Sequence, residues 1–254
     1  MKIVVAIKQV PARDSLLRAE GSWIQEADLT WEINEPDAYA LESALQLREK
    51  NGGEVIALCA GPERATTTIR EALAKGADRA IHIADDGVDK LDTLGIARVL
   101  AKAVESEKPD LVLTGLQSDD LGYGQTGVVL AELLGYAHST IIMSVEVEGS
   151  GIRVKRELEG GWYQNIALPM PAVLTIQSGS SKLRYATLMG IKKAKSKEVR
   201  TLSLSDLGVS ADPVARISRV YLPHKSKSTQ MLEGSPKEQA AKLVEKLRFE
   251  VRAL

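Results

Sequence analysis

The sequence predicts an α/β fold: a doubly wound, mostly parallel sheet with an added hairpin and an extended C-terminal arm that ends in a helix. Three observations predict it. Short β-branched runs alternate with helix-length amphipathic segments in the first half. A segment of alternating apolar and polar residues follows, and the last third is polar before one final amphipathic stretch. We therefore expect an α/β domain over residues 1–191 and an arm with its helix over residues 192–254.

The parallel sheet is predicted by four short apolar runs. They are KIVVAIK, EVIALCAG, RAIHIA and DLVLTG, at residues 2–8, 54–61, 79–84 and 110–115. Helical segments lie between them at residues 36–53, 62–78 and 92–110. Each begins with Pro or Asp near its start, and the first two end on Gly, as helices tend to. Right-handed crossovers between successive strands then give a parallel sheet covered on both faces.

The second half of the sequence has a different pattern of apolar and polar residues. From Ala137 onward apolar and polar residues alternate around a Gly-Ser-Gly turn, which is typical of an antiparallel hairpin, and residues 168–177 predict a further strand. After about Lys192 the chain is polar, and residues 222–235 show no regular period. The predicted last helix, residues 236–254, has one apolar face: Leu243, Val244, Leu247, Val251 and Leu254. A helix reached through such an arm is expected to dock on another surface.

Composition excludes several classes of function. The 254 residues are 44% hydrophobic and 26% charged, enough for a large core without metal or disulfide support. Lys plus Arg total 33 against 34 Asp plus Glu, so no bulk charge attracts nucleic acid or an anionic membrane. The single cysteine excludes an internal disulfide, and neither a signal peptide nor a membrane-spanning segment is predicted. We expect a cytoplasmic protein with no nucleic-acid partner and no membrane insertion.

A glycine-rich loop follows the fourth apolar run. Gly122, Gly124 and Gly127 form a literal G-x-G-x-x-G, but a dinucleotide fingerprint follows the first strand, so we interpret the match as accidental. If a helix begins here, the N–H groups near Gln125, Thr126 and Gly127 are unpaired donors at its positive end, where a phosphate would bind. The alternative is that Gly122 and Gly124 merely permit a tight turn and Thr126 caps the helix.

Other reactive residue types do not form a catalytic or metal-binding pattern. Cys59 is interpreted as a small buried residue near the ligand rather than a nucleophile, because no histidine is near it in sequence. Asp119 and Asp120 could bind Mg²⁺, yet adjacent acids in a turn are usually solvated or cap a backbone. The Lys-rich residues 192–197 are interpreted as a solvated strip or partner-steering patch. The three histidines are scattered along the chain: His82, His138 and His224.

Four segments together resemble one family. They are VAIKQVP at the start, ALCAGPERATTTIREALAKGADRAIHI (57–83), LTGLQSDDLGYGQTG, and LPMPAVLTIQSGSSKLRYATLMGIKKAKSK (168–197). The combination of QTG with RYATL and KKAKSK is more specific than any single motif. Over nearly its whole length the chain resembles the beta subunit of electron transfer flavoprotein, whose fold is an adenine-nucleotide-hydrolase-like α/β domain.

The resemblance implies a function. Such subunits pair with an alpha subunit that carries the redox-active FAD, and the pair passes electrons from flavin dehydrogenases to an acceptor. Most beta subunits bury a structural AMP, whereas electron-bifurcating members hold a second FAD in that place and use NADH. The chain would then be an electron-carrier subunit without hydrolytic or transferase chemistry of its own, and an oxidoreductase only if it is bifurcating.

The resemblance also implies nucleotide contacts. They follow the first strand, precede the first helix, follow the second strand and occupy the glycine-rich loop: Ala6, Asn34, Cys59, Gly61, Asp120, Gly124, Gln125, Thr126 and Gly127. The sequence departs from many AMP-binding members here. Gly124 stands where an Asn usually precedes QTG, and Leu121 and Gly122 stand where acidic residues are usual. These changes open space and remove negative charge, so both AMP and FAD remain open.

Partner contacts carry over in the same way. Arg184, Tyr185 and Leu188 belong to RYATL, which matches the loop that grips partner dehydrogenases, with Leu188 as its apolar anchor. Met189 replaces the usual Pro after that anchor. Glu157 matches a carboxylate that pairs with an alpha-subunit arginine near the flavin. From the residues alone, Leu188 could equally belong to the core, and Glu157 would be an exposed strand charge.

Two other classes use a similar sheet. An ATP pyrophosphatase or adenylating enzyme normally follows its first strand with a Ser-Gly-Gly loop, and residues 8–14 contain no Gly. A universal-stress-type ATP-binding module would explain the sheet but neither the hairpin nor the arm. The absence of catalytic groupings after the strands favours the electron-carrier interpretation.

Overall fold

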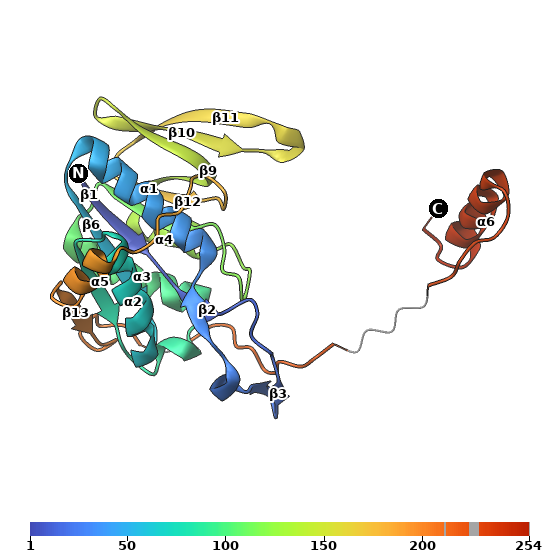
Figure 1. The fold of residues 1–254 in the computed structure, drawn as a ribbon, viewed down its shortest axis with the longest axis horizontal. Helices are drawn as coiled ribbons and strands as arrows, with labels where there is room; N and C mark the ends of the chain where they lie inside the picture. The colour runs from blue at the N-terminus through green and yellow to red at the C-terminus, as the bar shows by residue number, and fades with distance from the viewer. Residues whose placement is uncertain (211, 224–228, 254) are drawn as a thin grey trace.

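The centre of the molecule is a twisted sheet flanked by helices (Figure 1). The computed structural model describes residues 1–210, 212–223 and 229–253, and within these ranges nine strands share the sheet in the order β11-β10-β9-β12-β8-β1-β6-β7-β13. Seven neighbouring strands are parallel: β9 (Ala137–Glu148), β12 (Ala172–Ile176), β8 (Leu111–Gly115), β1 (Lys2–Ala6), β6 (Glu54–Ala60), β7 (Arg79–Ile83) and β13 (Val199–Leu202). Two antiparallel strands, β10 (Gly151–Glu157) and β11 (Tyr163–Pro169), extend one edge.

Both faces of the parallel sheet are covered by helices. Ile3 and Val5 of β1 pack in one core cluster and Val4 in the other, because successive side chains of a strand point to opposite faces. The first cluster contains residues of α1 (Glu35–Asn51), α2 (Thr66–Lys75) and α5 (Leu188–Ala194). The second contains residues of α3 (Thr93–Glu107) and α4 (Thr126–Leu134). The predicted α/β class with a mostly parallel sheet is confirmed.

Local sequence signals explain the helix ends. Pro36 lies in the first turn of α1, where its missing N–H costs nothing, and Gly52 follows the helix with a φ of 72°. Asp92 caps α3 by accepting a hydrogen bond from the Gly95 N–H at 2.8 Å. The described part of the chain also contains four short 3₁₀ segments: η1 (Glu26–Asp28), η2 (Glu63–Ala65), η3 (Val88–Lys90) and η4 (Glu159–Gly161).

The structure divides one predicted strand into two. Residues 168–177 were expected to form one strand, but β11 ends at Pro169 and β12 begins at Ala172. The two strands lie at different places in the sheet, since β11 is an edge strand and β12 pairs with β8 and β9. Because residues 168–177 are mostly apolar, their composition did not reveal the turn between β11 and β12. Its signal was Pro171, which lacks the N–H that a central strand donates.

The sheet also continues further along the chain than predicted. The expected division after residue 191 falls inside α5, and β13 then pairs in parallel with β7 at the opposite edge. Two small ribbons near the end of β1 were not predicted either. One joins β2 (Gln9–Pro11) to β5 (Trp31–Ile33), and the other joins β3 (Ala19–Glu20) to β4 (Trp23–Ile24).

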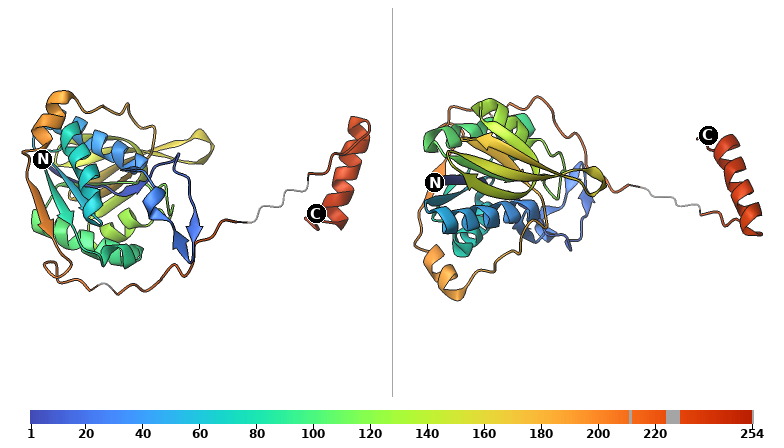
Figure 2. Two further views of the ribbon diagram at one scale, coloured as in Figure 1. Left: turned by 60° about the horizontal axis from the view of Figure 1, so that its bottom comes forward. Right: turned by 90° about the horizontal axis from the view of Figure 1, so that it is seen from above.

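The C-terminal helix α6 (Pro236–Phe249) lies apart from the sheet (Figures 1 and 2). It begins with a capping box in which Ser235 and Glu238 satisfy each other's backbone N–H groups. The helix ends five residues before the predicted limit at residue 254, so Val251 follows it, and Leu254 lies outside the described residues. None of its residues is buried. Among the described residues, no helix combines the length and apolar character needed to cross a membrane.

Candidate functional site

A cleft of about 150 Å³ opens beyond the carboxyl ends of β1, β6 and β8. The chain runs from β1 to β6 and β7 on one side and then returns to β8 on the other side of β1. Strand order therefore reverses between β1 and β8, which is where open α/β sheets bind ligands. The volume is roughly ten times what a single water molecule requires. The cleft is large enough for part of a small organic ligand.

The buried start of α1 holds these strand ends together. One carboxylate oxygen of Asp37 accepts the Lys8 N–H at 2.8 Å, and the other accepts the Gly115 N–H at 2.9 Å. Burial raises the pKa of Asp37 to about 7, against the opposing effect of these two hydrogen bonds. A Cβ at Gly115 would collide with Pro36 and Asp37, so only glycine allows β8 and α1 to approach this closely. Asp37 thus fixes the floor of the cleft.

Asn34 holds the glycine-rich loop in the same way. Its Nδ2 donates to the Gln117 carbonyl at 3.0 Å, and its Oδ1 accepts the Asp119 N–H at 2.9 Å. Asp119 in turn accepts the Glu35 N–H, the first of α1, at 3.3 Å. The Asp119 carboxylate is therefore used by a helix start, as the capping interpretation predicted.

The three glycines of the loop are required for two different structural reasons. Gly122 and Gly124 have φ values of 66° and 62°, which L side chains rarely adopt. Gly127 has ordinary backbone angles, but a Cβ there would meet Thr175 Cγ2 at 2.5 Å and Thr114 Oγ1 at 2.7 Å. Two glycines therefore make the turn, and the third lets α4 pack directly on β8 and β12.

The start of α4 faces the cleft with free donors. Its N-cap residue is Gln125, whose side chain makes no capping hydrogen bond, so the alternative in which Thr126 caps the helix is wrong. The first bond into this turn runs from the Val129 N–H to the Gln125 carbonyl at 2.9 Å. Among the described residues, the N–H groups of Thr126, Gly127 and Val128 have no acceptor. Together with the helix dipole they form a site of positive potential.

The rest of the cleft combines one ion pair with an apolar side. Lys8 lines the cleft, and its Nζ donates to both oxygens of Asp120 at 2.7 and 2.6 Å. Burial would raise the pKa of Asp120, but the Lys8 ammonium and hydrogen bonds from Ser118 and the Leu121 N–H together outweigh this and lower it. Ala60 at the end of β6 and Ile96 and Leu100 of α3 supply apolar lining.

The structure brings most of the expected nucleotide residues to one place. Five of them line the cleft: Ala6, Asn34, Gly124, Gln125 and Thr126. Gly127 is the next residue of α4 and packs against Thr114 and Thr175, and Asp120 is adjacent through its ion pair with Lys8. Cys59 and Gly61 are not in the lining. Cys59 is fully buried in the core cluster, and burial raises its thiol pKa to about 12, which agrees with an unreactive residue.

Three kinds of lining residue were not predicted from the sequence. Asp37 has the signal of an ordinary acid in the first turn of a helix. Lys8 has no pattern around it that distinguishes it from a surface lysine. Ile96 and Leu100 lie on the expected apolar face of a helix, where a core role is the default interpretation.

The histidines do not converge. His82 is buried, and its Nε2 lies 3.1 Å from the Gly61 carbonyl oxygen. His138 is exposed on β9, and His224 lies outside the described residues. In the described ranges, no group of three or more His, Cys, Asp or Glu side chains is arranged to hold a metal ion.

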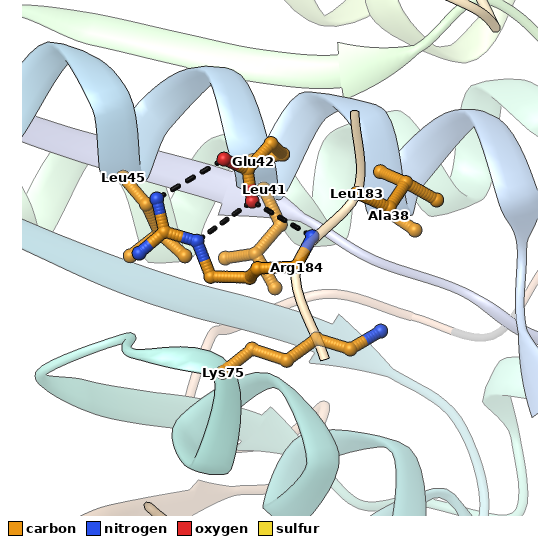
Figure 3. A pocket seen from close by; sticks show the side chains of 7 residues that line it. All are labelled: Ala38, Leu41, Glu42, Leu45, Lys75, Leu183 and Arg184. Carbon is orange, nitrogen blue, oxygen red and sulfur yellow. Dashed lines mark hydrogen bonds and ion pairs between the residues drawn. The ribbon is translucent and has the colours of Figure 1, made fainter. Parts of the chain in front are cut away.

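The expected partner residues do not line the cleft. Tyr185 and Leu188 are 89% and 88% exposed, so the alternative in which Leu188 belongs to the core is wrong. Glu157 ends β10, and its carboxylate accepts a hydrogen bond from Gln177 Nε2 at 3.2 Å. Arg184, in contrast, points back onto α1 and binds the carboxylate of Glu42 (Figure 3). It also binds the carboxylate of Glu49 on the same helix.

The chain is similar to proteins of known class. A family model for the electron transfer flavoprotein domain matches residues 22–207. The electron transfer flavoprotein subunit beta of Methylophilus methylotrophus is 38% identical over 96% of this chain and 97% of its own. That of Bacillus subtilis (strain 168) is 36% identical over the full length of both chains. That of Sus scrofa is 40% identical over 82% of this chain and 81% of its own.

Proposed function

The chain belongs to the electron transfer flavoprotein beta subunit family, and on this basis we propose that its cleft holds AMP as a structural ligand beside an alpha subunit that carries FAD. The family implies a role in electron transfer and an alpha-subunit partner. The bound FAD of that partner supplies the redox chemistry. This chain contributes position: it binds a nucleotide, shapes the surface near the flavin and presents contacts to other proteins.

The observation that carries the proposal is the set of unpaired N–H groups at the start of α4. Thr126 lines the cleft, and Gly127 and Val128 follow it in the first turn of α4, so a phosphate bound at this helix start would accept their N–H groups. A helix N-terminus with a glycine loop in front of it is a common phosphate site in α/β proteins. The Lys8 ammonium also lies at this cleft, but Asp120 at 2.6 Å balances its charge, so the attraction for an anion comes from the donors of α4. The donor set fits an anionic group.

The apolar side of the cleft fits a purine. Ile96 and Leu100 face the cleft from α3, and Ala6 and Ala60 are small enough to let a flat ring approach the strand ends. A nucleotide would then span the cleft from the apolar side to α4.

A larger dinucleotide is the second candidate. Gly122 and Gly124 carry no side chain at the edge of the cleft, and a Cβ at either would make only ordinary contacts, at 3.9 and 3.7 Å, with backbone oxygens of the loop itself. Leu121 and Tyr123 at the edge of the cleft are 46% and 54% exposed, and either could cover a longer ligand. This favours FAD as the alternative, which would make the heterodimer a bifurcating enzyme that uses NADH.

Two surfaces are proposed for partners. Tyr185 and Leu188 are the contacts for flavin dehydrogenases, because large apolar side chains this exposed gain most from burial in a partner. Glu157 and α6 are the contacts for the alpha subunit. The single cysteine, which cannot form an internal disulfide, is compatible with the cytoplasm as the proposed location.

The test is the nucleotide content of the purified heterodimer. The complex is denatured, and the released nucleotides are separated by chromatography, identified by mass and counted per heterodimer. One AMP and one FAD are the expected result. Two FAD and no AMP would replace the simple carrier with the bifurcating alternative, and a single FAD with no second nucleotide would overturn the proposed role of the cleft.

A further inference from the structure

Arg184 is enclosed by charges of its own chain. Its Nε donates to Glu42 Oε2 at 2.7 Å, and one terminal nitrogen donates to Glu42 Oε1 at 3.0 Å (Figure 3). The other terminal nitrogen donates to Glu49 Oε1 at 2.6 Å. The Glu42 side chain is only 5% exposed. The two glutamates lie two turns apart on α1, so one planar guanidinium bridges them along the helix.

The preceding residue fixes the same point by packing. Leu183 contacts the core cluster beneath α1, beside Ala38, Leu41 and Leu45. Only about 10 Å³ of free volume remains between these side chains and Arg184, less than one water molecule needs. The chain is therefore held at residues 183 and 184 by an apolar contact and by a forked ion pair at once.

A second anchor follows a few residues later. Thr187 Oγ1 accepts the Gly190 N–H at 3.0 Å and caps α5. A Cβ at Gly190 would collide with the Ala74 carbonyl, so α5 lies directly on the end of α2. Arg70 then donates to the Ala194 carbonyl at 2.7 Å. Between the two anchors stand the exposed Tyr185 and Leu188.

The charges of the first anchor are stable at neutral pH. Burial would raise the pKa of Glu42, but the hydrogen bonds from Arg184 and Gln46 outweigh it and leave the pKa below its usual range. The Arg184 hydrogen bonds also lower the pKa of Glu49. Both glutamates raise the pKa of Arg184. The bridge is thus fully ionised under physiological conditions.

We propose that Arg184 is a positioning residue: bound in cis to Glu42 and Glu49, its guanidinium preorganises Tyr185 and Leu188 for a flavin dehydrogenase. This rests on the proposed docking role of those two side chains. A loop already fixed in its bound shape loses less conformational entropy on association. Arg184 itself then makes no contact with the dehydrogenase, in contrast to the expectation from the family resemblance.

The bridge needs arginine in particular. A lysine would keep the positive charge, but its single ammonium cannot form the fork that spans Glu42 and Glu49. Direct attraction to an acidic partner would survive Arg184→Lys, whereas positioning would not. Glu42→Gln removes the bridge from the other side, and the buried Glu42 has almost no surface to offer a partner.

The experiment uses the purified heterodimer and, as electron donor, the flavin dehydrogenase from the same organism that reduces it. Steady-state reduction is measured for Arg184→Lys, Glu42→Gln, the double variant and Leu188→Ala. Hydrogen exchange of the amides of residues 185–190 is measured on the same samples. The control is Arg153→Lys, because Arg153 also forms a forked pair, with Glu148 at 2.8 Å through both nitrogens, on a hairpin away from this loop.

We expect KM for the heterodimer to rise on the order of ten-fold in both single variants, with kcat close to that of the parent. KM of the double variant should equal KM of either single variant, because each single substitution already removes the same bridge. Amides 185–190 should exchange faster, and Arg153→Lys should change neither quantity. Dithionite should reduce the flavin of every variant normally.

Three results would overturn the inference. The first is a KM for Arg184→Lys equal to that of the parent, while Leu188→Ala raises KM. This result would keep the proposed docking role of Leu188 but contradict the positioning role of Arg184. Another is unaltered amide exchange in Glu42→Gln. A parental KM for Leu188→Ala would instead remove the docking role, and the positioning role with it.

Discussion

The cleft and the segment after β12 use the same helix in opposite ways. At the start of α1, Asn34 and Asp37 are buried, and their polar atoms are paired with the backbone around the cleft. Further along α1, Glu42 and Glu49 are paired with Arg184, but the neighbouring Leu188 is 88% exposed. The first region completes its hydrogen bonds within the chain, except where α4 offers donors. In the second region, the ion pairs of Arg184 hold the chain in place, and the apolar side chain of Leu188 stays exposed.

This difference shows which partner each region requires. A buried polar floor with a few free donors is suited to a small anionic ligand. Exposed apolar side chains on a fixed base are suited to another protein, because burial of their surface supplies the free energy of association. Substitutions in the cleft should therefore change stability and nucleotide content, and substitutions after β12 should change association.

The largest effect is expected from Asp37. Burial raises its pKa to about 7, whereas an unfolded chain has a value of about 3.9. Between these two pH values the unfolded state loses the proton and the folded state keeps it, so the free energy of unfolding falls as pH rises. The change is on the order of 4 kcal/mol, complete near pH 7. Asp37→Asn should gain stability relative to the parent across this window, in thermal unfolding from pH 4.5 to 8.

Asp37→Asn also separates the two regions. Its KM for the dehydrogenase should stay at the parental value while its stability profile changes. A stability difference between variant and parent that is constant across the pH range would show that this carboxylate is not buried as described.

Gly127→Ala should destabilise the protein by about 2–3 kcal/mol, because overpacking at a close helix–sheet contact forces the elements apart. The added Cβ would meet Thr175 and Thr114 at 2.5 and 2.7 Å. We expect a lower unfolding temperature and a lower nucleotide content per heterodimer. Gly61→Ala is the matched control for the unfolding temperature, since its Cβ would meet only Ala65 at an ordinary 3.5 Å. Equal unfolding temperatures for the two variants would contradict the packing argument.

Removal of residues 236–254 should weaken the heterodimer by about a hundred-fold. The helix exposes Leu243, Val244 and Phe249, which are 49%, 47% and 70% accessible in the free chain. The dissociation constant is measured by analytical ultracentrifugation, and Glu245→Ser on the same helix serves as the control. A dissociation constant equal to that of the full-length heterodimer would show that α6 is dispensable for association.

Leu188→Ala should raise KM for the dehydrogenase by about thirty-fold, since an exposed Leu seated in an apolar pocket contributes roughly 1.5–3 kcal/mol. The flavin spectrum and the unfolding temperature should stay unchanged. Leu133→Ala is the control, because Leu133 is 41% exposed on α4 and away from the loop. If both variants have the same KM, exposure alone does not identify a contact.

The sequence predicted elements where local signals were strong. The runs of β1, β6, β7 and β8 are bounded by Pro, Asp or Gly, and the loop before α4 is marked by its glycines. It did not separate β11 from β12, because LPMPAVLTIQ is apolar throughout and only its prolines mark the turn. It missed β13, a four-residue edge strand with two exposed residues.

The site was predictable only in part for a related reason. Gln125 and Thr126 belong to a contiguous motif, so their place at the cleft could be anticipated. Asp37 bonds to Gly115, 78 residues away, and Arg184 bonds to Glu42, 142 residues away. Pairs so distant along the chain have no local signature, and only the packing of α1 on the sheet brings them together.

The most direct test of the account is an experimental structure of the purified heterodimer, at a resolution that shows ligands. We expect a nucleotide in the cleft of this chain, with a phosphate oxygen within hydrogen-bond distance of the N–H groups of Thr126, Gly127 and Val128. A cleft filled by the chain's own side chains, or a nucleotide whose phosphates bind elsewhere, would contradict it.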